Sequence, residues 1–126
     1  MATIRNSNIV SKPAGEDLTS AQYMAVTLET DDTIDLADAI TDVVYGILQN
    51  APDAGEIAEV MVCGESKVVA NGALANGAIV GPATTGKVQT AVATQYPCGQ
   101  VTSPAGADLD LCVIEIIHSG VSIPAA

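Results

Sequence analysis

The stretch IAEVMVCGESKVVANGALANGAIV, residues 57 to 80, already indicates the fold class of this chain. Ile57 to Cys63 is a mostly apolar run of strand length, rich in residues that favour extended backbone. Gly64-Glu65 is a candidate tight turn into a second strand, Ser66 to Ala70, and Asn71-Gly72 turns the chain again. Short strands separated by turn residues are therefore expected here.

The rest of the chain continues in the same way. Turn residues recur about every eight to twelve residues, and no amphipathic segment reaches a usual helix length of about 11 residues. Asp35 to Asp42 fits either the end of a hairpin or a short helix, and both stay open. Further strands are expected at 22–28, 33–36, 43–48, 79–80, 87–92, 99–102 and 109–118. We expect an all-β fold, a compact sandwich or barrel.

The last expected strand, LDLCVIEIIH at residues 109–118, is apolar on both faces apart from Asp110 and Glu115. A strand of this kind is central in its sheet or covered on its second face. With so small a chain, another subunit is one candidate for such a cover.

Two segments echo each other and predict a two-lobed β unit rather than a solenoid of three or more repeats. Each runs as an apolar strand, a loop with Pro and Gly, and an acid-flanked strand: Tyr45–Leu48, Gly55 and Glu59–Val62 in one half, Cys98–Val101, Gly106 and Asp110–Val113 in the other. Gly46 and Gly55 are nine residues apart, whereas Gly99 and Gly106 are seven apart. The second loop is therefore expected to be two residues shorter.

The chain has 126 residues, which favours one domain. Residues 1–19 are polar, broken by Pro13 and Gly15, and are expected to form an extended arm, either loose or docked on a partner. Residues 20–120 are expected to form a single β domain and 121–126 a tail. Neither a signal peptide nor a membrane-spanning helix is expected, because the sequence has no apolar core of a leader and no run of about 18 apolar residues.

The net charge of -11 argues against nucleic acid as a direct partner, because such binding rests on Lys and Arg. Only Arg5, Lys12, Lys67 and Lys87 are positive, and the absence of Phe and Trp leaves few side chains on which bases could stack. Apolar residues nevertheless make up 48% of the chain. This combination suggests surface that is buried against other copies or against a partner protein.

The segment GPATTGKV, residues 81–88, has the spacing of a phosphate-binding P-loop in Gly81, Gly86 and Lys87. Val88 stands where that pattern needs Ser or Thr, and the β-branched residues that follow favour a strand over a helix. We therefore interpret the segment as a hairpin loop from Pro82 to Gly86. No cofactor is expected.

Neither a metal site nor a catalytic site is expected. The acidic stretch lacks the Gly and Glu positions of a calcium-binding EF-hand loop and is interpreted as a solvated face: Glu29, Asp31, Asp32, Asp35, Asp38 and Asp42. His118 is the only histidine, and Cys112, six residues before it, is too distant along one strand to pair with it. We expect no enzymatic activity.

Cys63, Cys98 and Cys112 are an odd number of cysteines without a C-x-x-C pair, and nothing around them resembles a zinc site. Two interpretations stay open. They are buried thiols in a reducing cytoplasm, or two of them form a disulfide, within the chain or between copies, after release from the cell.

Residues 43–91 resemble the core pattern of the small capsid cement proteins of tailed phages. The matching motifs are Y-G-Φ-Φ at Tyr45, A-G-E at Ala54, Φ-x-V-x-G ending at Gly64, G-A-Φ-x-x-G-x-x-V at Gly72–Val80, T-G-K-V at Thr85–Val88, and a second unit at Gly99 and Ala105–Leu109. The resemblance extends over about residues 20 to 118. The cysteines and the acidic stretch depart from the pattern.

This resemblance implies a β-tulip-like fold of short antiparallel strands, related to lambda-type decoration proteins, with an extended N-terminal arm. It implies a homotrimer that is made in the host cytoplasm, binds the major capsid protein on the capsid exterior and cements neighbouring subunits. The residues expected to contact the capsid are Ala2, Thr3, Ile4, Arg5, Asn6, Ser7, Asn8, Ile9, Val10 and Lys87.

Deletion of residues 1 to 12 is then expected to weaken capsid attachment without unfolding the domain. Two other classes remain open, a tail-tube or spike component of the virion and a nucleotide-dependent recombination factor.

Overall fold

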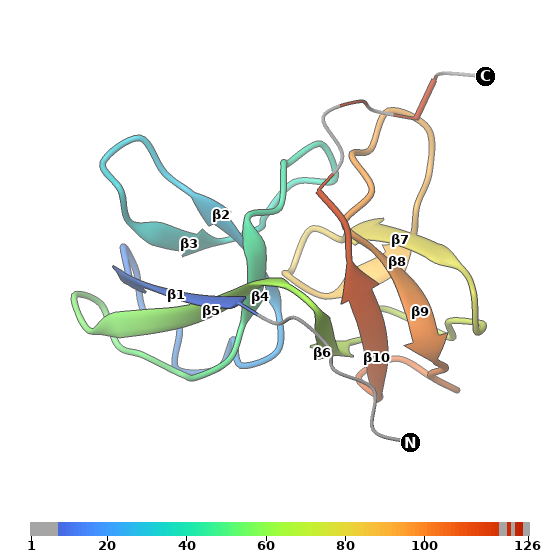
Figure 1. Cartoon of the computed structure of the whole chain (residues 1–126), viewed down its shortest axis with the longest axis horizontal. Helices are drawn as coiled ribbons and strands as arrows, with labels where there is room; N and C mark the ends of the chain where they lie inside the picture. Colours follow the sequence, from blue (N-terminus) through green and yellow to red (C-terminus); the bar gives the residue numbers. More distant parts are fainter. Residues whose placement is uncertain (1–7, 119–120, 122, 125–126) are drawn as a thin grey trace.

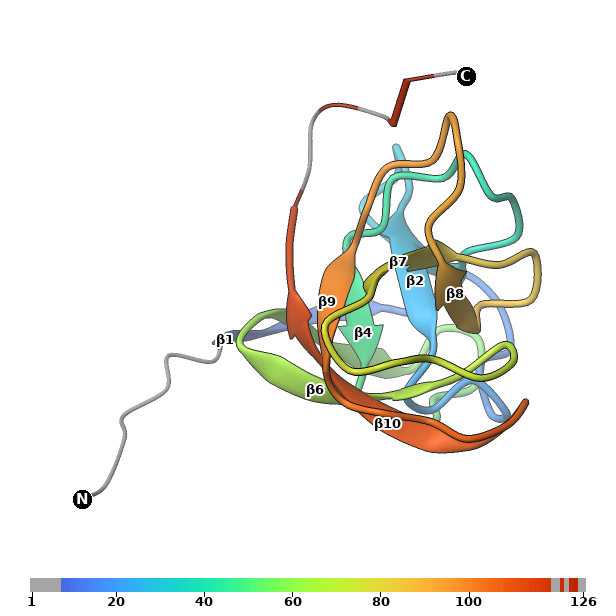
Figure 2. The same cartoon turned by 90° about the vertical axis from the view of Figure 1, so that its right-hand side faces the viewer.

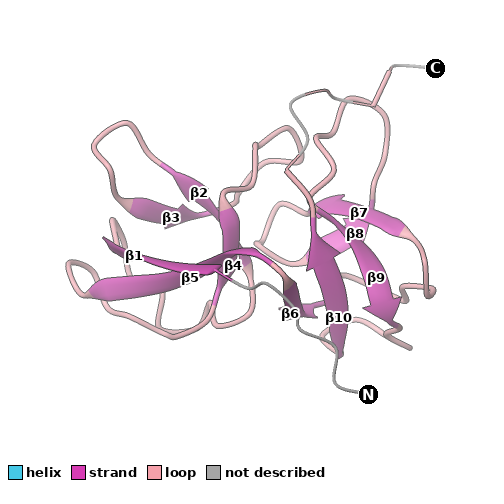
Figure 3. Ribbon diagram, in the orientation of Figure 1, coloured by secondary structure: helices cyan, strands magenta, loops and turns pink. Residues whose placement is uncertain are grey.

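The computed structural model describes residues 8–118, 121 and 123–124. The described residues contain strands and loops but no helix, and hence no helix that could cross a membrane (Figure 3). The all-β expectation is confirmed. The strands are β1 (Asn8–Pro13), β2 (Ala25–Leu28), β3 (Ile34–Leu36), β4 (Gly46–Leu48), β5 (Ile57–Cys63), β6 (Glu65–Val69), β7 (Ile79–Pro82), β8 (Val88–Thr90), β9 (Gly99–Ser103) and β10 (Leu111–Ile116).

The strands form two antiparallel sheets of five strands each, which lie side by side (Figure 1). The first sheet has the order β1-β5-β4-β2-β3 and the second β6-β10-β9-β7-β8. Neither sheet closes on itself, so the sandwich-like alternative is confirmed and the closed barrel is not formed.

The second sheet repeats the first, because adding five to every strand number in one order gives the other. We call β1–β5 the N-terminal repeat and β6–β10 the C-terminal repeat. Equivalent residues also pair in the same way. The antiparallel pair Val26–Gly46 in the first sheet corresponds to Val80–Gly99 in the second. The parallel bridge Ala14–Ile34 corresponds in the same way to Ala70–Val88.

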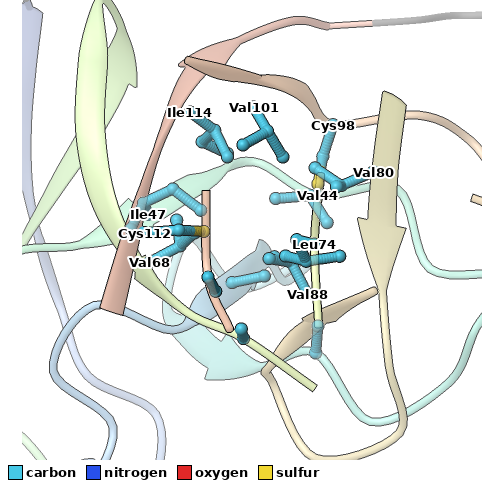
Figure 4. Packing of buried hydrophobic residues seen from close by; sticks show 14 residues of the cluster. Val44, Ile47, Val68, Leu74, Val80, Val88, Cys98, Val101, Cys112 and Ile114 are labelled. Carbon is cyan, nitrogen blue, oxygen red and sulfur yellow. The ribbon is translucent and has the colours of Figure 1, made fainter. Parts of the chain in front are cut away.

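The cores of the two repeats are built from equivalent positions. Seven buried residues in one repeat match seven in the other: Ala14, Leu18, Val26, Ile34, Leu48, Ala58 and Val60 correspond to Ala70, Leu74, Val80, Val88, Val101, Cys112 and Ile114. The larger cluster also includes Val44 and Ile47 from the N-terminal repeat, which lie among residues of the second sheet (Figure 4). The two repeats therefore share apolar contacts and form one folded unit.

The echo seen in the sequence is confirmed as a repeat, but its register differs from the one expected. The backbone N–H groups of Gly55 and Leu109 make equivalent hydrogen bonds of 2.9 Å, each to the carbonyl just after the first strand of its repeat. Gly55 therefore corresponds to Leu109 and not to Gly106. Leu109 lies ten residues after Gly99 and Gly55 nine after Gly46, so the second loop is one residue longer, not two shorter.

The last strand, β10, lies between β6 and β9, so its central place is confirmed. Gly64 does not turn a hairpin, because β5 and β6 belong to different sheets and the chain crosses between them there. Of the two alternatives for 35–42, the hairpin is the one that forms, with β3 paired to β2.

The β domain begins earlier than residue 20. β1 pairs along its whole length with β5, and both Ala14 and Leu18 are buried. The polar sequence hides this strand, because an edge strand has side chains facing solvent and shows little apolar periodicity. Deleting residues 1–12 would therefore remove a strand from the first sheet, contrary to the expectation that this deletion spares the domain.

Candidate interaction surfaces

Gly81 to Val88 forms the β7–β8 hairpin, as the sequence predicted. Pro82 pairs with Val88 across the hairpin, and the backbone N–H of Ala83 donates to the carbonyl of Lys87 at 2.7 Å. The chain continues from Val88 into β8, a strand, so this loop does not open a helix whose N-terminus could bind phosphate.

Lys87 is engaged within the chain. Its Nζ lies 3.1 Å from Asp108 Oδ1 in the β9–β10 loop, and its side chain is 16% exposed. The pair ties the hairpin to that loop. A contact between Lys87 and a capsid subunit stays a prediction, and any anion there would have the Asp108 carboxylate beside it.

The N-terminal contact residues fall into two groups. Ala2 to Ser7 lie outside the described residues, whereas Asn8, Ile9 and Val10 belong to β1 and pair with β5. β1 is the edge strand of its sheet, with Ile9 exposed. An edge strand can pair with a strand of another protein, so β1 suits the attachment expected for this end of the chain.

The three cysteines all lie in the described part of the chain, and no disulfide joins them there. Cys98 and Cys112 are buried in the core, and burial raises the pKa of both thiols, that of Cys98 to about 12. Such thiols stay protonated and unreactive near neutral pH. Cys63 is exposed at the end of β5, so a pairing between copies through this residue stays a prediction.

Acidic side chains gather around a hollow of about 320 Å³ beside β2 and β3. Its lining includes Glu16, Glu29, Asp35, Asp38 and Asp42. Burial raises the pKa of Asp35 above its usual value, and the nearby carboxylates add to this. Among the described residues, no group of three acidic, His or Cys side chains is arranged to hold a metal ion.

Asp35→Asn is expected to stabilise the chain, and more so at pH 7 than at pH 4. Asp35 Oδ1 is buried without a hydrogen-bond partner, so ionisation is unfavourable in the folded state. With its pKa raised on folding, this group contributes stability below the unfolded pKa and loses it as pH rises through the folded pKa. Urea unfolding at the two pH values measures the effect.

The matched control for this variant is Asp31→Asn, which removes the same charge. The Thr33 hydroxyl donates to Asp31 Oδ1 at 2.6 Å and, as the main cause, lowers the pKa of that carboxyl. Asp31 therefore contributes stability above its unfolded pKa, and its replacement should destabilise the chain at pH 7. Equal gains from both variants would mean that only the total charge matters.

A second hollow, of about 400 Å³, is mainly apolar and lies where equivalent loops of the two repeats meet. Its lining residues are Leu28, Val43, Val44, Tyr45, Tyr96, Pro97 and His118. Tyr45 and Cys98 donate equivalent backbone hydrogen bonds to the second strand of each repeat, so Val43-Val44 corresponds to Tyr96-Pro97. Local sequence patterns do not indicate this hollow, because its lining comes from separate segments that only an alignment of the two repeats brings together.

The comparisons with known proteins bear on the fold. No protein-family model matches the chain, and no curated protein matches it in sequence. Among solved structures, the fold is similar to the crystal structure of the N base of head fiber gp8.5 in bacteriophage phi29, with a TM-score of 0.66 and 16% identity. The match covers 92% of this chain and 98% of that chain. At this identity the likeness shows a shared fold, and the protein that shares it is named as a head fiber base.

Proposed function

We propose that this chain is a structural protein of a phage virion, which binds the capsid exterior and holds neighbouring major capsid protein subunits together. The observation that carries the proposal is the match to the phi29 head fiber base over nearly the whole length of both chains. A shared fold of this extent supports a role for this chain as a part of the phage head. The resemblance of the sequence to capsid cement proteins supports the same place in the virion.

The surface of the chain suits a mechanical role without catalysis. Large apolar side chains are exposed in both repeats, among them Ile9, Leu28, Val43, Ile57 and Leu111. Many copies, acting as homotrimers made in the host cytoplasm, would bury such side chains against capsid subunits. Each contact can be modest in area, because many linked contacts act together. The net charge of -11 keeps the free surface soluble.

Deletion of residues 1–7 is expected to weaken binding to capsids assembled without this chain, while leaving the urea unfolding midpoint unchanged. The deletion keeps β1, which begins at Asn8, and removes the preceding segment that includes Arg5. Cosedimentation of the variant with such capsids measures attachment. Full binding by the shortened chain would remove the N-terminal segment from the proposed contact.

A second candidate function is the base of a head fiber, which is favoured by the name of the structural neighbour. A cement protein should raise the temperature at which the capsid opens, because it joins neighbouring subunits. A fiber base need only remain attached. Thermal opening of capsids with and without bound protein distinguishes the two, and imaging of the virion tests the tail-tube and spike alternatives.

A further inference from the structure

Three left-handed backbone positions occur at equivalent places in the two repeats. In each pair one repeat has glycine and the other a larger residue: Gly77 (φ 85°) with Tyr23 (64°), Gly86 (80°) with Asp32 (67°), and Gly55 (83°) with Leu109 (70°). Residues with a side chain are strained in this region, whereas glycine is not. Glycine is therefore sufficient for the fold at each of these places. The presence of a larger residue needs a separate explanation.

Two of the larger residues use their side chains inside the chain. The Tyr23 ring lies 5.7 Å from the Lys67 ammonium, and Asp32 accepts a hydrogen bond of 2.7 Å from Lys12. Leu109 is 65% exposed, and its apolar side chain can make no polar contact of this kind. Its backbone N–H makes a hydrogen bond of 2.9 Å that Gly55 makes equally well. Strain and an exposed apolar side chain at one residue point to a contact outside the chain.

Leu109 lies in a run of exposed residues, Gly106 to Leu111, which we call the Leu109 tip. The tip connects β9 to β10 and lies at the edge of the molecule (Figure 2). Leu111 is 51% exposed, and two carboxylates, Asp108 and Asp110, alternate with the two leucines. Two contacts tie the tip to the rest of the chain, the ion pair between Lys87 and Asp108 and the hydrogen bond from the Leu109 N–H to the Ala70 carbonyl, and such contacts lower the cost of ordering the tip on binding.

We propose that the Leu109 tip inserts its leucines into an apolar recess with a cationic rim on the capsid shell. This inference rests on the proposed function and identifies one contact through which the chain would attach to the capsid. The alternation of acid and leucine sets the chemistry of the partner, since carboxylates beside a buried apolar contact favour positive groups opposite them.

A second copy of this chain does not fit that description. Each tip carries two carboxylates, Asp108 and Asp110, and no Lys or Arg, so two tips would repel each other. The three lysines of the described residues already contact groups of their own chain: Lys12 with Asp32, Lys67 with Tyr23 and Lys87 with Asp108.

The test compares Leu109→Gly with wild type in urea unfolding and in binding to capsids assembled without this chain. We expect a midpoint no lower than that of wild type, because glycine relieves the strain, and binding weaker by at least tenfold. Thr94→Gly is the matched control. Thr94 is exposed and has φ 71° but lies in the β8–β9 loop, so this variant should be as stable and bind as wild type does.

Salt and charge test the cationic rim. Wild-type binding should weaken between about 50 mM and about 500 mM salt, and Asp110→Asn should bind more weakly with a smaller salt dependence.

Several results would overturn the proposal. If Leu109→Gly bound capsids as tightly as wild type, the tip contact would be overturned and the proposed function would stand. If the wild-type chain itself did not bind capsids, the tip contact and the proposed function would both be overturned. A lower urea midpoint for Leu109→Gly would show that the side chain serves folding. A change in the oligomeric state of Leu109→Gly with unchanged capsid binding would assign the tip to a second copy.

Discussion

Gly46→Ala is expected to lower the free energy of unfolding by about 3 kcal/mol. A Cβ atom at Gly46 would overlap the carbonyl oxygen of Met61 and lie 2.6 Å from Cγ1 of Val60, both in the neighbouring strand β5. Relief would require β4 and β5 to separate, and their backbone hydrogen bonds resist that. A loss of this size is a large part of the stability of a small domain, typically about 5–15 kcal/mol. Urea unfolding measures the loss of unfolding free energy, with the same dependence on urea concentration used for both proteins.

Two other glycines calibrate this result. A Cβ at Gly106 would lie 3.6 Å from Asp110 Oδ2, an ordinary contact, so Gly106→Ala should be nearly neutral. Gly99 is the counterpart of Gly46, and a Cβ there would lie 2.6 Å from Ile114 Cδ1 and 2.9 Å from the carbonyl oxygen of Glu115. Gly99→Ala should give an intermediate loss, because the end of the Ile114 side chain can move. Equal stability of Gly46→Ala and Gly106→Ala would contradict the close approach of β4 and β5.

Gln95→Leu is expected to destabilise the chain by about 4 kcal/mol, because it leaves three polar groups without their partner. Gln95 is fully buried. Its Oε1 accepts from the backbone N–H of Val92 at 2.8 Å, and its Nε2 donates to the carbonyls of Pro82 at 2.6 Å and Ile40 at 3.1 Å. Ile40 belongs to the N-terminal repeat and Pro82 to the C-terminal repeat, so this amide joins the two.

The control is Gln100→Leu, which has the same change in side-chain shape and polarity. Gln100 is exposed, and its Nε2 donates to the carbonyl of Gly77 at 3.1 Å, a group that water can satisfy after the substitution. Its loss should stay within about 1 kcal/mol. Thermal and urea unfolding of both variants separate the two cases, and a Gln95→Leu protein as stable as Gln100→Leu would show that the buried amide does not join the repeats.

Local patterns predicted much of the fold. Ile57–Cys63 was expected as a strand with the same bounds that β5 has, because apolar β-favouring residues end there at a glycine. The hairpin at Gly81–Val88 followed from turn residues between short apolar runs. Alignment of the two halves failed in one respect. The sequence pairs Gly55 with Gly106 because the residue types agree, whereas backbone hydrogen bonds pair Gly55 with Leu109.

That shift is the reason why Leu109 was not singled out from the sequence. An exposed leucine in a loop is unremarkable until its backbone conformation and its glycine counterpart are known. Gln95 escaped notice for a similar reason. Its sequence neighbours Thr94 and Tyr96 do not indicate burial, and its partners Ile40 and Pro82 are distant along the chain.

The sequence by itself determined the all-β class, the hairpin in place of a P-loop and the central position of β10. These features depend on residues within one strand and its adjoining turns. Only the tertiary structure decided that β1 belongs to the first sheet, which residues of the two repeats are equivalent, and that Leu109 occupies a glycine position. Those features depend on hydrogen bonds and packing between segments far apart in the chain, where many side chains can satisfy the same backbone geometry.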